Sequence, residues 1–257
     1  MAGAAPSLAL ERCLRATVGY DGTDFAGFQV QVEQRTVQGE LESALGTITQ
    51  QSTRITGAGR TDSGVHAVGQ VVAFRTRWQR SVEELWRAWN AVLPKDVVIR
   101  SLAETDPAFH PRFDATSRSY RYTVWNHPVR DPLSRRTALW ESRSLDLEAM
   151  NQAAGLLCGE HDYATFGTPP QGNNTVRYVF EAGWRRNQVM HFRIVANAFL
   201  YRMVRSIVGT LLQVGRGELT VDEFADRFAA ADRSLAGPTA PAHGLCLMAV
   251  EYQGVPE

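Results

Sequence analysis

Residues 52–76 read STRITGAGRTDSGVHAVGQVVAFRT, and this stretch has the pattern of two strands joined by a glycine-rich connection. Its two ends, Ser52–Thr56 and Gln70–Thr76, are short runs rich in β-branched and apolar residues, which predict two strands. The segment between them, Gly57–Ala67, holds three glycines and is expected to be a connection at one end of a sheet. Side chains in such connections are held by a rigid scaffold and are often functional.

Two elements are expected on each side of this pair of strands. Apolar residues at helical spacing mark one helix, and Ser81 with Glu84 forms a capping box at the start of another. The predicted elements are a strand over Leu14–Tyr20, a helix over Thr36–Ile48, a helix that ends at Leu93, and a strand over Val97–Ala103. The order is therefore β-α-β-β-α-β.

The same order recurs after a polar, proline-containing link at Thr105–Ala115. A capping box at Thr220 and Glu223 adds one short helix as an insertion. The predicted elements are a strand over Arg118–Trp125, a helix from Asp146 through Leu157, a hairpin of Arg177–Trp184 and Val189–Val195, a helix over Phe199–Val214, and a strand over Leu245–Tyr252.

Each half thus has the order of the split β-α-β, or ferredoxin-like, unit. We predict an α+β fold whose central antiparallel sheet is built from two ferredoxin-like halves, with helices on one face and a cleft between the halves. The N-terminal half, residues 1–110, carries the aspartate loop, and the C-terminal half, residues 111–257, carries a tyrosine strand and an arginine helix. The halves share no residue-level repeat, so the duplication is architectural.

Composition narrows the class of protein. A chain of 257 residues with 44% hydrophobic content is ordinary for a globular protein. It has no apolar run long enough to span a membrane, and its start lacks the features of a signal peptide. We therefore expect a cytoplasmic protein without membrane attachment.

The charged residues and cysteines favour some partners over others. The cysteines Cys13, Cys158 and Cys246 form no CxxC pair, which argues against a structural zinc site. Formal net charge is zero, but only Lys95 is lysine and the other 26 basic residues are arginine. Arginine grips phosphate in a bidentate fork and stacks on bases. A GC-rich genome is an equally good reason for this bias, and a basic cleft is compatible with zero net charge.

The glycine segment carries the chemistry-bearing side chains. Asp62 stands in it between Arg60 and His66. No lysine follows the glycines as in a phosphate loop, and the spacing is not GxGxxG. One histidine near one aspartate is a poor metal site, so we predict no metal and no cofactor. A carboxylate held in an accessible loop can act on a ligand bound against it.

Two further groups stand in the second half. Strand alternation places Tyr120 and Tyr122 on one face and Arg121 on the other. Helical spacing places Arg202, Arg205 and Gly209 on one face of the predicted helix. Arg205 lies among apolar residues, so it is expected to be partly buried and to need an acidic partner.

With these residues the chain resembles a known family, the TruA-type pseudouridine synthases, which isomerise uridine in the tRNA anticodon arm. The resemblance runs nearly from end to end, and its blocks follow one another in the family's order. They are Tyr20–Thr23, Ala26–Gln29, Thr36–Gln38, GAGRTDSGVHA, Phe109–Phe113, Tyr120–Tyr122, Ala196–Phe199, Met203–Gly209 and Ala240–Leu245.

The resemblance assigns roles to single residues. It makes Asp62 the catalytic carboxylate, Tyr120 the tyrosine beside the target base and Arg205 the partner of Asp62. It also implies that Arg60 holds the site open after the base is flipped, and that Leu245 lines the uracil pocket. It further implies RNA contacts by Gln29, His66 and Arg202. The substrate would be tRNA, modified at positions 38, 39 and 40, and the enzyme would be a homodimer.

The sequence departs from the family in a few places. Val30 replaces a basic residue between Gln29 and Gln31, which puts one RNA contact in doubt. Tyr201 and Arg202 stand where histidines are common, and Ser206 where asparagine is common.

Two other classes of function stay open at this point: a non-catalytic RNA-binding module, and a hydrolase of a nucleoside or glycosidic bond. An acidic side chain in the most accessible loop disfavours the first. The lack of a second carboxylate near Asp62 disfavours the second.

Overall fold

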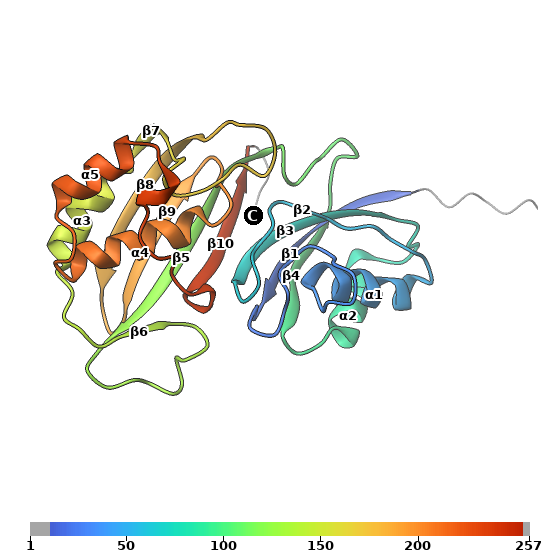
Figure 1. The fold of residues 1–257 in the computed structure, drawn as a ribbon. Helices are drawn as coiled ribbons and strands as arrows, with labels where there is room; N and C mark the ends of the chain where they lie inside the picture. The colour runs from blue at the N-terminus through green and yellow to red at the C-terminus, as the bar shows by residue number, and fades with distance from the viewer. Residues whose placement is uncertain (1–10, 254–257) are drawn as a thin grey trace, which may run out of the picture.

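The computed structural model describes residues 11–253, which form one continuous sheet with helices beside it (Figure 1). The strand order across the sheet is β4-β1-β3-β10-β5-β9-β8-β7, with β2 paired to β3 and β6 to β5. The predicted α+β class with a central sheet of two related halves is confirmed. Nearly all strand pairs are antiparallel, while β10 with β3 and β5 with β6 are parallel.

The first half has the strand order β4-β1-β3-β2, which is that of a ferredoxin-like unit. The helices begin where the sequence predicts: the side chain of Thr36 caps α1, and Ser81 with Glu84 forms the capping box of α2. Its elements are β1 (Arg12–Tyr20), α1 (Val37–Thr49), β2 (Thr56–Gly57), β3 (His66–Thr76), α2 (Val82–Val92) and β4 (Val97–Glu104).

The second half repeats the arrangement with the order β10-β5-β9-β8. Asp146 caps α3 through the backbone N–H of Ala149, and Thr220 with Glu223 forms the capping box of α5. Its elements are β5 (Ala115–Asn126), β6 (Leu139–Glu141), α3 (Leu147–Gly155), β7 (Gly159–Asp162), β8 (Val176–Arg186), β9 (Met190–Ala196), α4 (Met203–Gly215), α5 (Val221–Ala229), two short 3-10 turns (Arg233–Leu235 and Ala242–Gly244) and β10 (Leu245–Tyr252).

The halves meet where β10 pairs with β3. Only two residue pairs join these strands, one of which is Leu247 with Ala67. Further along the same edge of β3, β2 takes over, with Gly57 opposite Val72. The segment between β2 and β3 therefore leaves the sheet at the junction of the two halves. We propose that the halves divide near residue 110, in the turns that precede β5.

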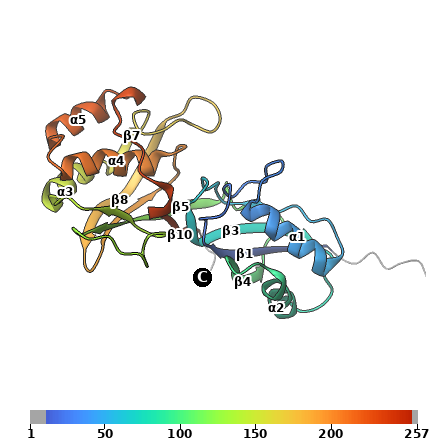
Figure 2. The same cartoon turned by 60° about the horizontal axis from the view of Figure 1, so that its bottom comes forward.

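Each half has its own hydrophobic core, and both cores lie on the same face of the sheet. Tyr20, Ala67, Leu247 and Tyr120 stand opposite one another on successive strands, so they share a face. The first three belong to the core under α1 and α2, and Tyr120 packs against both cores. Figure 2 shows α1 and α2 at one end of the sheet and α3, α4 and α5 at the other.

Two predicted elements are shorter than expected. The strand over Ser52–Thr56 is reduced to β2, because side chains of α1 take its backbone groups: Glu42 accepts from the Ile55 N–H, and Gln38 donates to the Ile55 carbonyl. The helix over Phe199–Val214 begins only at Met203, because the backbone of Tyr201 forms an isolated bridge with Thr168.

Arg202 is therefore outside α4, contrary to the prediction that it shares a helical face with Arg205. It precedes the helix with φ of +62°, in the left-handed region. The strands β6 and β7 were not predicted from the sequence, because each is only a few residues long.

The junction makes a prediction about stability. A Cβ atom added at Gly69 would lie 2.2 Å from the carbonyl oxygen of Met248 in β10. Gly69→Ala must therefore push β3 away from β10, and we expect it to lower the free energy of unfolding by about 1–3 kcal/mol. Gly155→Ala is the control, because a Cβ there meets nothing within 4 Å. Urea unfolding of both variants checks this, and equal stability would contradict the tight junction.

Candidate active site

The loop that carries Asp62 is held from one side by the segment after β1. The backbone N–H of Phe28 donates to the Thr61 carbonyl at 3.1 Å, and the Ser63 hydroxyl donates to the Phe25 carbonyl at 3.0 Å. Gly27 has φ of +99°, and a Cβ there would lie 2.8 Å from the Thr61 carbonyl oxygen. Glycine is required at this close approach.

Buried polar side chains also hold the loop that carries Asp62. The hydroxyl groups of Tyr20 and Thr61 lie 2.8 Å apart, and the amide of Gln70 donates to the Gly59 carbonyl at 2.9 Å. Tyr20, Thr61 and Gln70 are all buried. The backbone on the N-terminal side of Asp62 is therefore fixed, and the carboxylate direction is set before any ligand arrives.

Asp62 and Arg205 form an ion pair between the two halves. The guanidinium Nη1 donates to Asp62 Oδ2 at 3.0 Å. The Nε of Arg205 donates to the Ala240 carbonyl at 2.8 Å, and the Ala240 N–H donates back to the Arg205 carbonyl at 3.0 Å. The side chains keep 23% and 16% of their exposure, so the carboxylate is compensated yet reachable. One nitrogen contacts the carboxylate, so the pair is not a bidentate fork.

Tyr120 lies on the same face of the sheet, where the two cores meet. Its ring packs edge-on against Phe199, with centroids 5.0 Å apart and planes at 85°. Burial raises the pKa of the Tyr120 hydroxyl well above its usual range, and the nearby charge of Asp62 raises it further. The hydroxyl is consequently neutral at physiological pH.

Arg118 is a residue near the site that was not predicted from the sequence. It stands two residues before Tyr120 and therefore on the same face of β5. Its guanidinium donates to four backbone carbonyls, from Ala115, Asn197, Ala58 and Arg112, at 2.5–3.3 Å. These carbonyls belong to the aspartate loop, the turns between the halves, the first residue of β5 and the segment before α4. Burial lowers the pKa of Arg118. Strand alternation from Tyr120 was the signal that could have indicated it.

The two other predicted site residues are Leu245 and Arg60. Leu245 is buried at the start of β10, in the core of the second half and opposite Tyr122. Arg60 is exposed on the aspartate loop, two residues before Asp62. Their roles toward a base stay predictions.

The three residues with expected RNA contacts lie in different places. Gln29 is half-buried in the segment after β1. Arg202 is exposed, with its guanidinium carbon 4.9 Å from the centre of the Tyr201 ring. His66 is buried, and its Nδ1 accepts from the Gly22 N–H at 3.0 Å. Since His66 pairs with Cys246 in β10, it faces away from Asp62 and Tyr120. RNA contacts by these residues stay predictions.

The arrangement can perform chemistry with a carboxylate, a guanidinium and a neutral phenol. Within residues 11–253 no group of three or more histidine, cysteine or acidic side chains could hold a metal ion. No helix in that range has the length and hydropathy of a membrane span.

Comparisons with known proteins identify the family. Residues 16–114 and 153–253 match the family model described as tRNA pseudouridine synthase. The chain is 47% identical to tRNA pseudouridine synthase A of Chloroflexus aurantiacus, over 94% of this chain and 89% of that protein. It is 43% identical to the protein of the same name from Geobacillus kaustophilus, over 93% and 94%.

Among solved structures, an archaeal box H/ACA sRNP Nop10-Cbf5 complex aligns with 88% of this chain and 60% of that one, at 11% identity and a TM-score of 0.40.

The match to the tRNA pseudouridine synthase family model covers most of the chain, and it includes both Asp62 and Arg205. The chain therefore belongs to the tRNA pseudouridine synthase family.

Proposed function

We propose that this protein converts uridine to pseudouridine in the anticodon stem-loop of tRNA, at positions 38, 39 and 40, with Asp62 as the catalytic carboxylate. The observation that carries the proposal is the ion pair of Asp62 with Arg205, beside Tyr120 at the junction of the halves. Family membership supplies the reaction, and this geometry supplies a compensated, accessible carboxylate where a flipped base could bind.

The reaction fits the side chains that are present. The N1–C1′ bond breaks, the uracil rotates, C5 bonds to C1′, and the proton lost from C5 is balanced by one gained at N1. No electrons are consumed. A target base inside a stem or loop must first leave its stack. In this proposal Arg60 holds the site open once the base is flipped, while Tyr120 and Leu245 contact the uracil.

Asp62 can act in two ways, as a nucleophile at C1′ or as a base at C2′. Both need an ionised carboxylate, and Arg205 compensates that charge at 3.0 Å. The two routes share these residues and differ only in the intermediate.

Product analysis separates the proposal from its alternatives. Unmodified tRNA is incubated with the protein, and pseudouridine is mapped position by position. Pseudouridine at positions 38–40 supports the proposal. Free uracil would indicate a hydrolase, and unchanged RNA would indicate a binding module.

We further propose that the protein acts in the cytoplasm as a homodimer. One chain of 257 residues is small beside a whole tRNA, so one subunit could modify the anticodon arm while the other grips the body. Because net charge is zero, tRNA affinity would come from localised arginines and fall steeply with salt. The mass in solution and the salt dependence of tRNA binding test this.

Asp62→Asn should lower the rate of pseudouridine formation by roughly a thousandfold or more, because the amide can act neither as nucleophile nor as base. Affinity for tRNA should be kept or rise, since a charge that repels phosphate is removed. Asp222→Asn, on the exposed first turn of α5, is the control. Single-turnover rates and tRNA binding measure both effects. A comparable rate in the Asp62 variant would remove Asp62 from catalysis.

Arg205→Lys should lower the rate by roughly tenfold to a hundredfold although charge is kept. Arginine uses two separate nitrogens, Nη1 for Asp62 and Nε for the Ala240 carbonyl, and the single nitrogen of lysine cannot occupy both positions. A lost charge-assisted hydrogen bond costs about 1.5–3 kcal/mol. Arg87→Lys, at an exposed position of α2, is the control. A melting curve excludes a folding defect. Near-normal kinetics would show that Arg205 does not orient Asp62.

Tyr120→Phe should lose less activity than Tyr120→Leu, because the neutral hydroxyl is a poor base and the ring provides the stacking surface. Since burial raises the pKa of Tyr120, its hydroxyl should not titrate between about pH 6 and about pH 9. The pH profiles of the native and Phe proteins should therefore have the same form. An alkaline limb that vanishes in the Phe variant would instead assign the base role to Tyr120.

A further inference from the structure

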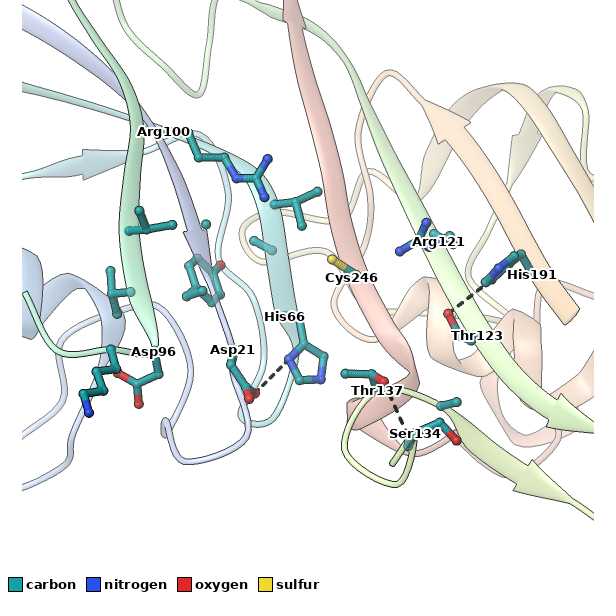
Figure 3. Close-up of a pocket in the computed structure, with 18 of the residues that line it drawn as sticks. Asp21, His66, Asp96, Arg100, Arg121, Thr123, Ser134, Thr137, His191 and Cys246 are labelled. Atoms are coloured by element: carbon teal, nitrogen blue, oxygen red, sulfur yellow. Dashed lines mark hydrogen bonds and ion pairs between the residues drawn. The ribbon is translucent and has the colours of Figure 1, made fainter. Parts of the chain in front are cut away.

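A second site candidate is a cavity of about 570 Å³ that spans the junction between the halves. Figure 3 shows side chains from both halves pointing into it. Its lining includes Asp21, Asp96, Arg100, Arg121 and Cys246.

This cavity lies on the face of the sheet opposite to Asp62. Cys246 of β10 stands opposite His66 of β3 and Arg121 of β5, one position before the row that contains Leu247 and Tyr120. Because neighbouring residues of a strand point to opposite faces, the Cys246 row lies on the face without helices. The cavity is therefore separate from the proposed active site.

The carboxylates in this cavity already have partners. Asp21 accepts from the backbone and hydroxyl of Thr23, and lies 3.1 Å from the Nδ1 of His66. Asp96 accepts from two nitrogens of Arg35, at 2.7 and 3.0 Å. Thr23 and Arg35 thus hold these carboxylates, and neither carboxylate forms an ion pair with Arg100 or Arg121 in the described part of the chain.

Two arginines in the cavity have no acidic partner within residues 11–253. Arg121 projects from β5, and its Nε is buried without a hydrogen-bond partner in the described part of the chain. Arg100 projects from a bulge of β4, as the extra residue opposite Thr17 and Val18. Its Nε lies 3.1 Å from where a Cβ of Gly19 would stand, so the side chain passes over β1 in close contact with residue 19.

These two guanidinium groups line the same cavity from opposite halves. Figure 3 shows Arg100 and Arg121 on either side of Cys246. Burial raises the pKa of the Cys246 thiol, and the charges of Arg121 and Arg100 oppose this shift. Both guanidinium groups therefore interact electrostatically with the same side chain. Burial and Arg121 lower the pKa of His191, so that imidazole stays neutral and available for hydrogen bonding. Lys95 adds a third cation at the lining.

We propose that this cavity binds a phosphate group between Arg100 and Arg121. Guanidinium groups bind phosphate oxygens through paired hydrogen bonds, and their uncompensated charges favour an anion of more than one negative charge. The walls include Val68, Val98 and Val189, which lower the local dielectric and strengthen the attraction. The phosphate can come from the backbone of a bound RNA, which rests on the proposed function, or from a free phosphate compound, which does not.

The test uses the full-length protein with two probes, inorganic phosphate and unmodified tRNA. Phosphate binding is measured by calorimetry at constant ionic strength, and tRNA binding is measured over a series of salt concentrations. Arg121→Gln and Arg100→Gln are compared with Arg87→Gln, an exposed arginine of α2 outside the cavity. Arg100 is exposed, so its variant keeps the test valid if the Arg121 variant does not fold.

We expect each cavity variant to weaken phosphate binding about tenfold and Arg87→Gln to leave it unchanged. If the phosphate belongs to RNA, the slope of log affinity against log salt should also fall by about one. An unchanged slope with weakened phosphate binding assigns the site to a free phosphate compound. The proposal is overturned if neither probe separates the two cavity variants from the native protein. These readouts are binding measurements, so they stand apart from whether pseudouridine is formed.

Discussion

The pairing of β10 with β3 is the constraint on which both proposed sites depend. Only two residue pairs form there, and β2 pairs with Val72 and Ala73 further along the same edge of β3. The segment after β2 must therefore leave the sheet at the junction, and it carries Asp62 toward the second half. Glycine at position 69 lets the two strands approach closely at this point, because a Cβ there would lie 2.2 Å from the Met248 carbonyl oxygen.

The face of the sheet decides which side chains can cooperate at the junction. On the helix-covered face, the junction brings Asp62 to Arg205 and places Tyr120 between the cores. On the other face, the same strands carry Arg121 and Cys246. A shift of one residue in the pairing of β10 would move Cys246 to the helix-covered face and Leu247 to the other face.

The proposed active site combines fixed backbone with compensated charge. Thr61 is held through its hydroxyl and its carbonyl, and Arg118 ties the start of the aspartate loop to the second half through backbone carbonyls. A carboxylate placed in this way loses little freedom when a substrate binds, which is how preorganised sites lower reaction barriers. Tyr120 adds a neutral ring surface, because burial keeps its hydroxyl protonated.

The sequence by itself determined the β-α-β-β-α-β order of each half, the capping residues of α2 and α5, and the faces of Tyr120 and Tyr122. It also indicated the carboxylate loop and the pattern of the family. These features depend on periodicity and on side-chain to backbone contacts within a few residues, which a sequence records directly.

Only the tertiary structure decided where α4 begins, what Arg118 binds, and that Arg100 and Arg121 share a cavity. The backbone of Tyr201 pairs with Thr168, 33 positions earlier in the chain, and this contact outweighs the local helical pattern. Arg100 passes close to Gly19, on a neighbouring strand, where it lines the cavity. Contacts of this kind depend on which strands become neighbours, and no local pattern of residues encodes that choice.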